Sequence, residues 1–137
     1  MNYIEKMQLK HRQENNVLTS ADLLPIDEVL AKGTIFRKLY EPYKIIPKNP
    51  VPNSEQEKLM QEIQTYCIAC IDMTLYLDVN PSDKDAIDLF NMIKDRKEES
   101  KKKYEQIYGP LSLKSETLKG IPWTWLISKW PWVGSED

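Results

Sequence analysis

Two cysteines separated by two residues, Cys67 and Cys70, have the types and spacing in this chain that most readily suggest chemistry. Such a pair supports thiol redox chemistry when its first cysteine lies at a helix N-terminus, where the helix dipole lowers the thiol pKa. It also supplies two of the roughly four ligands that zinc requires. The one histidine, His11, lies in a distant polar stretch. A thiol redox or metal-binding protein is therefore the alternative hypothesis.

The neighbours of the two cysteines favour a packing role instead. Both cysteines fall inside a long run of apolar residues at helical spacing, and free cysteine is often buried. The Glu-x-x-His motif of di-metal helical bundles does not occur. Of the acidic residues in this run, we expect Asp72 to face solvent and Asp78 to belong to the helix end. We therefore expect no catalytic residue, no metal and no cofactor, and the protein is not expected to be an enzyme.

A first long helix is predicted from Ser54 to Asp78. Ser54 and Glu57 form the S-x-x-E pattern of a capping box, in which each side chain bonds a free backbone amide at the helix start. The apolar residues recur at spacings of three and four and form a broad stripe. They are Leu59, Ile63, Tyr66, Cys70, Met73 and Leu77, widened by Met60, Cys67, Ile71 and Leu75.

A second long helix is predicted to begin at Asn80-Pro81, with Asn80 as its cap and Pro81 at its first position. It ends at Gly109-Pro110, because glycine commonly follows a helix and proline cannot continue one. Its expected apolar face consists of Ala86, Phe90, Ile93, Tyr104 and Ile107. The short connection requires the two helices to be antiparallel. The predicted fold class is therefore all-α, built on an antiparallel αα-hairpin over residues 54–110.

The remaining segments differ in composition. Residues 1–22 form a polar N-terminal arm, expected to be mobile or ordered by a partner. Residues 23–45 contain a short helix candidate, 26–32, followed by Gly33 and an extended stretch over 34–40. Residues 46–53 form a proline-rich linker. Residues 111–137 form an irregular tail rich in tryptophan and proline.

Composition and charge exclude several classes of function. The net charge of −2 gives no reason to expect nucleic-acid binding. The basic run 101–103 is interleaved with acidic residues and fits a solvated helix end. No stretch approaches the roughly 18 apolar residues of a membrane span, and the N-terminus does not resemble a secretory signal. We therefore expect synthesis and retention inside a cell, without a membrane as the main partner.

The first helix carries more apolar surface than one neighbouring helix can bury. Its apolar residues extend over more than half of the circumference, so another element must pack there. The candidates are the N-terminal segment, the tryptophan tail, a second copy, or a different protein. Tryptophan buries a large area and is enriched in binding hot spots. The tail either folds back over the hairpin, docks on another protein, or, with Lys129, lies at a membrane surface.

Three motifs resemble the CotJB-type spore coat proteins. They are Leu75-Tyr76-Leu77-Asp78-Val79-Asn80-Pro81, then Tyr104-Glu105-Gln106-Ile107-Tyr108-Gly109-Pro110-Leu111, then Trp123-Thr124-Trp125 with Trp130-Pro131-Trp132. They occur in the family's order, and the resemblance covers about residues 55–133. The chain departs from the family at Val79-Asn80, where Thr-His is common, and at Lys129, where proline is common.

The upstream segment is similar to CotJA-type coat proteins, with their EAL-x-KGT-x-F-x-x-LY-x-PY pattern. Arg37 stands where that family often has proline. If both resemblances hold, two neighbouring coat proteins are joined here and act in one complex. The matching residues are Pro25, Glu28, Leu30, Lys32, Gly33, Thr34, Phe36, Leu39, Tyr40, Pro42 and Tyr43.

The resemblance implies a non-enzymatic structural or assembly protein, made in the mother-cell cytoplasm and placed in the inner layers of the endospore coat. It also implies partners: other coat proteins, above all a manganese-catalase-like protein, with self-association as a further possibility. Any metal and peroxide chemistry would belong to that partner. The expected partner-binding residues are aromatic: Phe36, Tyr40, Tyr43, Tyr76, Trp123, Trp125, Trp130 and Trp132.

Overall fold

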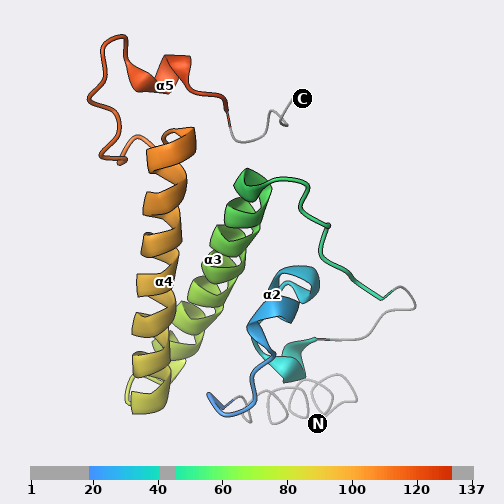
Figure 1. Cartoon of the computed structure of the whole chain (residues 1–137). Coiled ribbons are helices and arrows are strands. Elements are labelled where there is room, and N and C mark those ends of the chain that lie inside the picture. Colours follow the sequence, from blue (N-terminus) through green and yellow to red (C-terminus); the bar gives the residue numbers. More distant parts are fainter. Residues whose placement is uncertain (1–18, 41–45, 131–137) are drawn as a thin grey trace, which may run out of the picture.

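The computed structural model describes residues 19–40 and 46–130, and these residues are mainly helical (Figure 1). Their helices are α2 (Ile26–Lys32), α3 (Glu55–Val79), α4 (Lys84–Tyr108) and α5 (Thr124–Ile127), with a 3₁₀ turn over Arg37–Leu39. Between residues 19 and 130, leaving out 41–45, no strand is present, only an isolated bridge between Leu23 and Phe36. The all-α prediction is confirmed.

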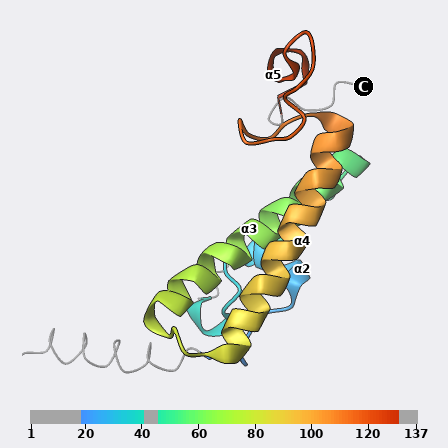
Figure 2. The same cartoon turned by 90° about the vertical axis from the view of Figure 1, so that its left-hand side faces the viewer.

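The two long helices α3 and α4 lie side by side and run in opposite directions (Figures 1 and 2). Near the start of α3, the Gln56 amide donates a hydrogen bond of 3.0 Å to the Tyr104 hydroxyl late in α4. One turn and a half further along, the Ser100 hydroxyl donates to the Glu62 carboxylate at 2.8 Å. These cross-helix bonds fix the antiparallel register, so the predicted hairpin is confirmed.

The start of α3 follows the sequence prediction closely. The Ser54 hydroxyl accepts from the Glu57 amide at 3.2 Å, as in a capping box. The Glu57 carboxylate reaches back to the Asn53 amide, at 2.6 Å, one residue earlier than that motif implies. Both bonds satisfy backbone donors that have no partner within the helix.

The turn between the helices differs from the prediction. Asn80 ends α3, its amide donating to the Tyr76 carbonyl at 2.9 Å, and the cap of α4 is Asp83. The Asp83 carboxylate accepts from the Ala86 amide at 3.1 Å and from the Tyr76 hydroxyl at 2.7 Å. The prediction of Asn80 as cap and Pro81 as first helical residue is therefore wrong. Aspartate caps a helix as well as asparagine does, and only at residue 83 does it also reach Tyr76.

Residues 19–40, which we call the N-terminal segment, pack on α3 through α2. Helix α4 packs on another side of α3 (Figure 1). Helix α2 has the predicted bounds, and Gly33 follows it with a φ of 71°. The segment contributes Val29, Ile35 and Phe36 to a core that also contains Ala69, Cys70, Met73, Tyr76, Ala86 and Ile93. The Phe36 and Tyr76 rings lie 5.4 Å apart. Of the candidates for covering α3, the N-terminal segment is thus one that does so.

One carboxylate on α3 fixes this segment. Asp72 accepts hydrogen bonds of 2.8 Å from both the Thr34 hydroxyl and the Ile35 amide. The expectation that Asp72 faces solvent is therefore wrong, because α2 and the residues after it lie over this side of α3. Asp78 is exposed next to the last residue of α3, as expected.

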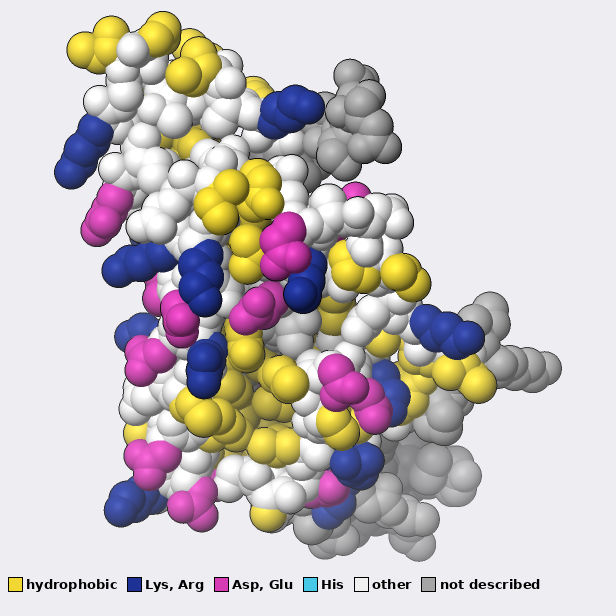
Figure 3. Space-filling model, viewed as in Figure 1, with side chains coloured by type: hydrophobic (Ala, Val, Ile, Leu, Met, Phe, Trp, Pro, Cys, Tyr) yellow, Lys and Arg dark blue, Asp and Glu magenta, His cyan; other side chains and the backbone are white. Residues whose placement is uncertain are grey.

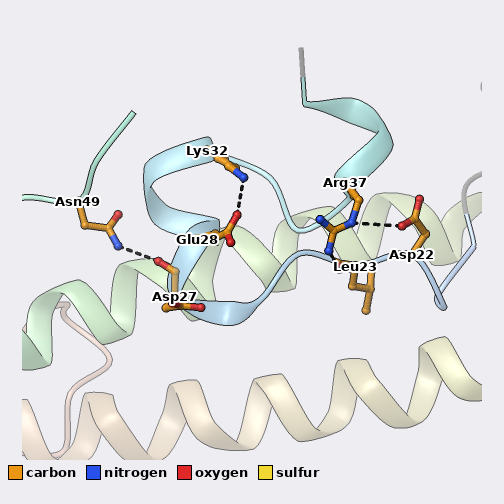
Figure 4. A network of polar contacts seen from close by, with 7 residues as sticks. All are labelled: Asp22, Leu23, Asp27, Glu28, Lys32, Arg37 and Asn49. Atoms are coloured by element: carbon orange, nitrogen blue, oxygen red, sulfur yellow. Dashed lines mark hydrogen bonds and ion pairs between the residues drawn. The ribbon is translucent and has the colours of Figure 1, made fainter. Parts of the chain in front are cut away.

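Polar contacts at the surface of the segment hold its ends (Figure 4). The Arg37 guanidinium donates to the Leu23 carbonyl at 3.1 Å and pairs with Asp22 at 3.4 Å. The Asn49 amide donates to the Asp27 carbonyl at 2.8 Å. Ser20, expected in a mobile arm, donates to the Asp83 carboxylate at 3.2 Å. The expected extended stretch 34–40 continues only to Phe36, where the 3₁₀ turn begins.

The apolar face of α4 is shorter than predicted. Ala86, Ile93 and Tyr104 are buried, whereas Ile107 is 66% exposed. Gln56, at the start of α3, already lies opposite Tyr104. Residues after Tyr104 therefore have no turn of α3 to pack against, and Ile107 is exposed for that reason.

The hydrogen bonds of Asp72 predict that its replacement lowers stability more than replacement of an exposed carboxylate does. Asp72→Ala leaves the Thr34 hydroxyl and the Ile35 amide without their acceptor, which should lower the free energy of unfolding by about 1–3 kcal/mol. Urea unfolding measures this loss, and hydrogen exchange should show faster exchange at the Ile35 amide. Asp95→Ala, which removes an exposed carboxylate on α4, is the control and should change stability little. Equal effects of the two substitutions would contradict this role of Asp72.

The Asp83 contacts predict a pH dependence. The Tyr76 hydroxyl, followed by the Ala86 amide, lowers the pKa of Asp83 below its usual value. Ionised Asp83 therefore stabilises the fold at neutral pH, and this contribution is lost as the pH falls through the lowered pKa. Asp83→Asn should lower the melting temperature at pH 7, and the difference from wild type should shrink near about pH 3. Asp88→Asn, at an exposed site, is the control. A pH-independent difference would argue against this linkage.

Candidate docking surfaces

The two cysteines lie in the middle of α3. Cys70 is buried, Cys67 is half-buried, and both are free thiols. Burial raises the pKa of the Cys70 thiol, and the nearby positive charge of Lys97 only partly opposes this effect. The thiol therefore stays protonated at neutral pH, unlike the low-pKa thiols of redox sites. Within residues 19–40 and 46–130, no group of three or more His, Cys, Asp or Glu side chains is placed to hold a metal ion. His11 lies outside the described residues.

The aromatic residues expected to bind a partner occupy different environments. Phe36 and Tyr76 are buried, at 2% and 8% exposure, and contact each other across the interface between the N-terminal segment and α3. Their role in this structure is to join two parts of one chain. Tyr40 is half-buried, and the Lys32 ammonium lies 5.1 Å from the centre of its ring. Tyr43 lies outside the described residues.

The tryptophan-bearing tail presents exposed apolar side chains. Trp123 is 47% and Trp130 46% exposed, Trp125 is half-buried, and Trp132 lies outside the described residues. Ile121, Leu126 and Ile127, which the sequence interpretation missed, are more exposed than either tryptophan. Apolar residues interspersed among tryptophans were the available signal for them. We call the exposed set the tail patch: Ile121, Trp123, Leu126, Ile127 and Trp130.

The tail patch lies at one end of the molecule, on and beside α5, beyond the end of α4 (Figures 1 and 3). Apolar side chains gather there in the space-filling view, clear of the α2–α3 core (Figure 3). Isolated exposed apolar residues are normal, but a contiguous group often marks an interaction site. The arrangement is suited to contact with an apolar surface of another protein.

A close contact at the end of α4 positions the tail. Gly109 has a φ of 111°, and a Cβ placed on it would lie 2.6 Å from the Ser128 Cβ. Glycine is therefore required here both for its backbone conformation and for space. The Leu111 amide donates to the buried Glu105 carboxylate at 3.0 Å, and the Ser128 hydroxyl donates to the Thr124 carbonyl at 2.8 Å. These contacts hold the residues after Gly109 against the C-terminal end of α4.

A second apolar surface lies on α3 itself. Ile71 and Leu75 are each 61% exposed and Val79 is 78% exposed, at successive spacings of four. Residues four apart lie on the same face of a helix. The apolar circumference predicted for α3 is thus buried by α4 and by the N-terminal segment on two sides and remains exposed along this stripe.

The sequence model of the CotJB protein family matches residues 57–133, which is more than half of the chain. The chain belongs to the CotJB family. CotJB proteins are components of the spore coat, so membership implies a spore coat protein. The match contains α3 from its third residue onward, all of α4 and the tail patch. No curated protein and no solved structure matched the chain.

The family match begins at residue 57, so the N-terminal segment lies outside it. The CotJA resemblance of residues 23–45 stays a prediction. Among the helices that the structure describes, none has both the length and the apolar character needed to cross a membrane.

The Gly109 contact predicts displacement of the tail by a single methyl group. Gly109→Ala places Cβ against Ser128, so residues 111–128 should exchange amide hydrogens faster and the tryptophan emission should shift. Gly33→Ala is a matched control, because Gly33 also has positive φ but has open space around its Cβ position. Gly33→Ala should cost about 1–2 kcal/mol through its left-handed backbone, whereas Gly109→Ala should cost more, because φ 111° with ψ 174° is a conformation that essentially only glycine adopts. An unchanged tail in Gly109→Ala would contradict the positioning role of Gly109.

Proposed function

We propose that this CotJB-family chain is a non-enzymatic assembly protein of the inner endospore coat that docks other coat proteins through its tail patch. The observation that carries this proposal is the family match, whose range, 57–133, includes every residue of the patch. Support comes from exposure, since the patch residues are between 46% and 100% exposed. Contiguous exposed apolar side chains often mark a site at which another protein binds.

The tail patch has the composition of a binding hot spot. Two tryptophans and three large aliphatic residues lie within ten positions, and α5 and the Gly109 contact give them a defined arrangement. A pre-ordered apolar surface loses little conformational freedom when it binds. We infer that the tryptophans enter apolar pockets on the partner. Trp132, at the end of the same motif, is proposed to extend this contact.

The partner that we propose is a manganese-catalase-like protein of the same operon. This proposal rests on the resemblance of residues 55–133 to CotJB-type proteins and of residues 23–45 to CotJA-type proteins. Peroxide and metal chemistry would then belong to the partner, because burial raises the pKa of the Cys70 thiol and the described part of this chain shows no cluster of metal ligands. This chain would attach the partner to the coat.

The N-terminal segment is proposed to be a CotJA-like module joined to the CotJB module. Its burial against α3 and the Asp72 hydrogen bonds support the view that the two modules act as one unit. Phe36 and Tyr76 then serve contact between modules, while Tyr40 and Tyr43 remain proposed partner contacts. The surface offered to other coat proteins is mainly that of the tail.

Two apolar residues of the tail patch provide the test. The double substitution Trp123→Ala with Leu126→Ala should weaken binding of the purified catalase-like protein by at least about thirtyfold, since even one hot-spot residue contributes about 2 kcal/mol or more. Calorimetry measures the affinity. In sporulating cells, the variant should be depleted from coat extracts.

Met92→Ala is the matched control, because Met92 is 57% exposed on α4, away from the tail. It should bind as wild type does. Unchanged binding and unchanged coat recovery for the double variant, with its helical circular dichroism intact, would rule out the tail patch as the docking surface.

A further inference from the structure

The side of α3 that faces solvent carries a continuous row of mainly apolar residues with one polar residue at each end. We call it the α3 outer face: Gln64, Cys67, Ile68, Ile71, Leu75 and Asp78. Ile71 and Leu75 are each 61% exposed, Gln64 and Asp78 are exposed, and Cys67 and Ile68 are half-buried. Spacings of three and four place these residues along one side of the helix.

Charge is nearly absent from this face. Between Glu62 and Asp78 the only charged residue is Asp72, and its carboxylate bonds Thr34 and Ile35 on another side of α3. Helix α4 shows the opposite composition, with exposed charged residues recurring along it at Lys84, Asp88, Asp95, Glu98 and Lys102. A helix face that remains in water is ordinarily charged like that of α4. The composition of the α3 outer face is that of a surface in contact with protein.

The polar residues of the face are placed symmetrically. Gln64 and Asp78 lie seven residues on either side of Ile71, and Cys67 and Leu75 lie four residues on either side. Seven residues are about two helical turns, so all five positions lie along one line of contact. A two-fold axis through Ile71 therefore exchanges Gln64 with Asp78 and Cys67 with Leu75.

We propose that the α3 outer face binds a second copy of this chain in an antiparallel, two-fold contact centred on Ile71. In this arrangement the Gln64 amide of one copy donates to the Asp78 carboxylate of the other, twice. Ile71 packs on its own counterpart, and Cys67 packs against Leu75. Such a contact uses the same patch on both copies, as two-fold dimers do.

Charge complementarity favours this antiparallel arrangement over a parallel one. A parallel pair in register would place Asp78 against Asp78, and like charges at a contact are destabilising. The antiparallel pair gives each carboxylate an amide donor and leaves no carboxylate facing another. The net charge of the chain is only −2, so long-range repulsion between copies is weak.

The size of the contact indicates a dimer that dissociates on dilution. One helix face of about four turns buries less surface than the roughly 800 Å² per partner of a standard interface. This dimer is independent of which coat protein the tail patch binds, because the tail patch lies beyond the end of α4 and the outer face lies on α3. Each dimer would then offer two tail patches.

Cysteine crosslinking on the full chain tests both the surface and the direction. Leu75→Cys, with native Cys67 retained, should give a covalent dimer under mild oxidation, because residues 67 and 75 meet across the axis. Adding Cys67→Ser to this variant should abolish the dimer, since the two copies of residue 75 lie about 12 Å apart along the helix axis, too far for a disulfide. Met92→Cys, exposed on α4, is the matched control and should not crosslink.

Several results would overturn the proposal. Crosslinking of the wild-type chain through Cys67 alone, or of the variant combining Cys67→Ser and Leu75→Cys, would indicate a parallel pair. Equal crosslinking of the Leu75→Cys and Met92→Cys variants would indicate random collision. If the catalase-like protein blocks the crosslink, that partner occupies this face instead.

Sedimentation provides a second measurement that does not depend on disulfide formation. Wild-type chain should shift from monomer to dimer as its concentration rises, whereas Ile71→Glu places two carboxylates at the axis and should remain monomeric with unchanged circular dichroism. A wild-type chain that stays monomeric at every soluble concentration would refute the dimer.

Discussion

The burial of α3 is the constraint on which the rest of the structure depends. This helix is apolar over more than half of its circumference, and a single antiparallel neighbour buries only one side of it. The chain supplies a second cover from its own N-terminal segment, held by Asp72 and by the contact of Phe36 with Tyr76. With α4 and the N-terminal segment in place, Ile71 and Leu75 are still exposed, and we propose that this remaining side of α3 is an interaction surface.

Features set by local sequence could be predicted, whereas features set by distant contacts could not. The start of α3 and the end of α2 were predicted correctly, because nearby residues determine them. These residues are Ser54 and Glu57 at the start of α3 and Gly33 directly after α2. Asp72 was assigned to solvent because helical periodicity does not reveal that a segment nearly forty residues earlier in the sequence returns to that side. The cap at Asp83 was missed because its choice depends on Tyr76 as well as on the turn.

The family match and the structure together distinguish the hairpin and tail from the N-terminal segment. The CotJB match identifies the hairpin and the tail as the part shared with other spore coat proteins, and the hairpin carries the tail at its end. Cys70 is buried, whereas Cys67 is only half-buried. Burial raises the pKa of the Cys70 thiol, which is the reverse of what thiol chemistry requires. The exposed apolar side chains of the tail patch are suited to contact with other proteins.

Hydrogen–deuterium exchange of the full chain, alone and with the purified catalase-like protein, tests the central claim most directly. That claim is that the N-terminal segment belongs to the fold and the tail patch to the partner. We predict that residues 20–40 are protected together with α3 in the free chain, and that the partner adds protection mainly at residues 121–130. Rapid exchange over 20–40 in the free chain, or partner protection confined to the α2–α3 core, would contradict the account.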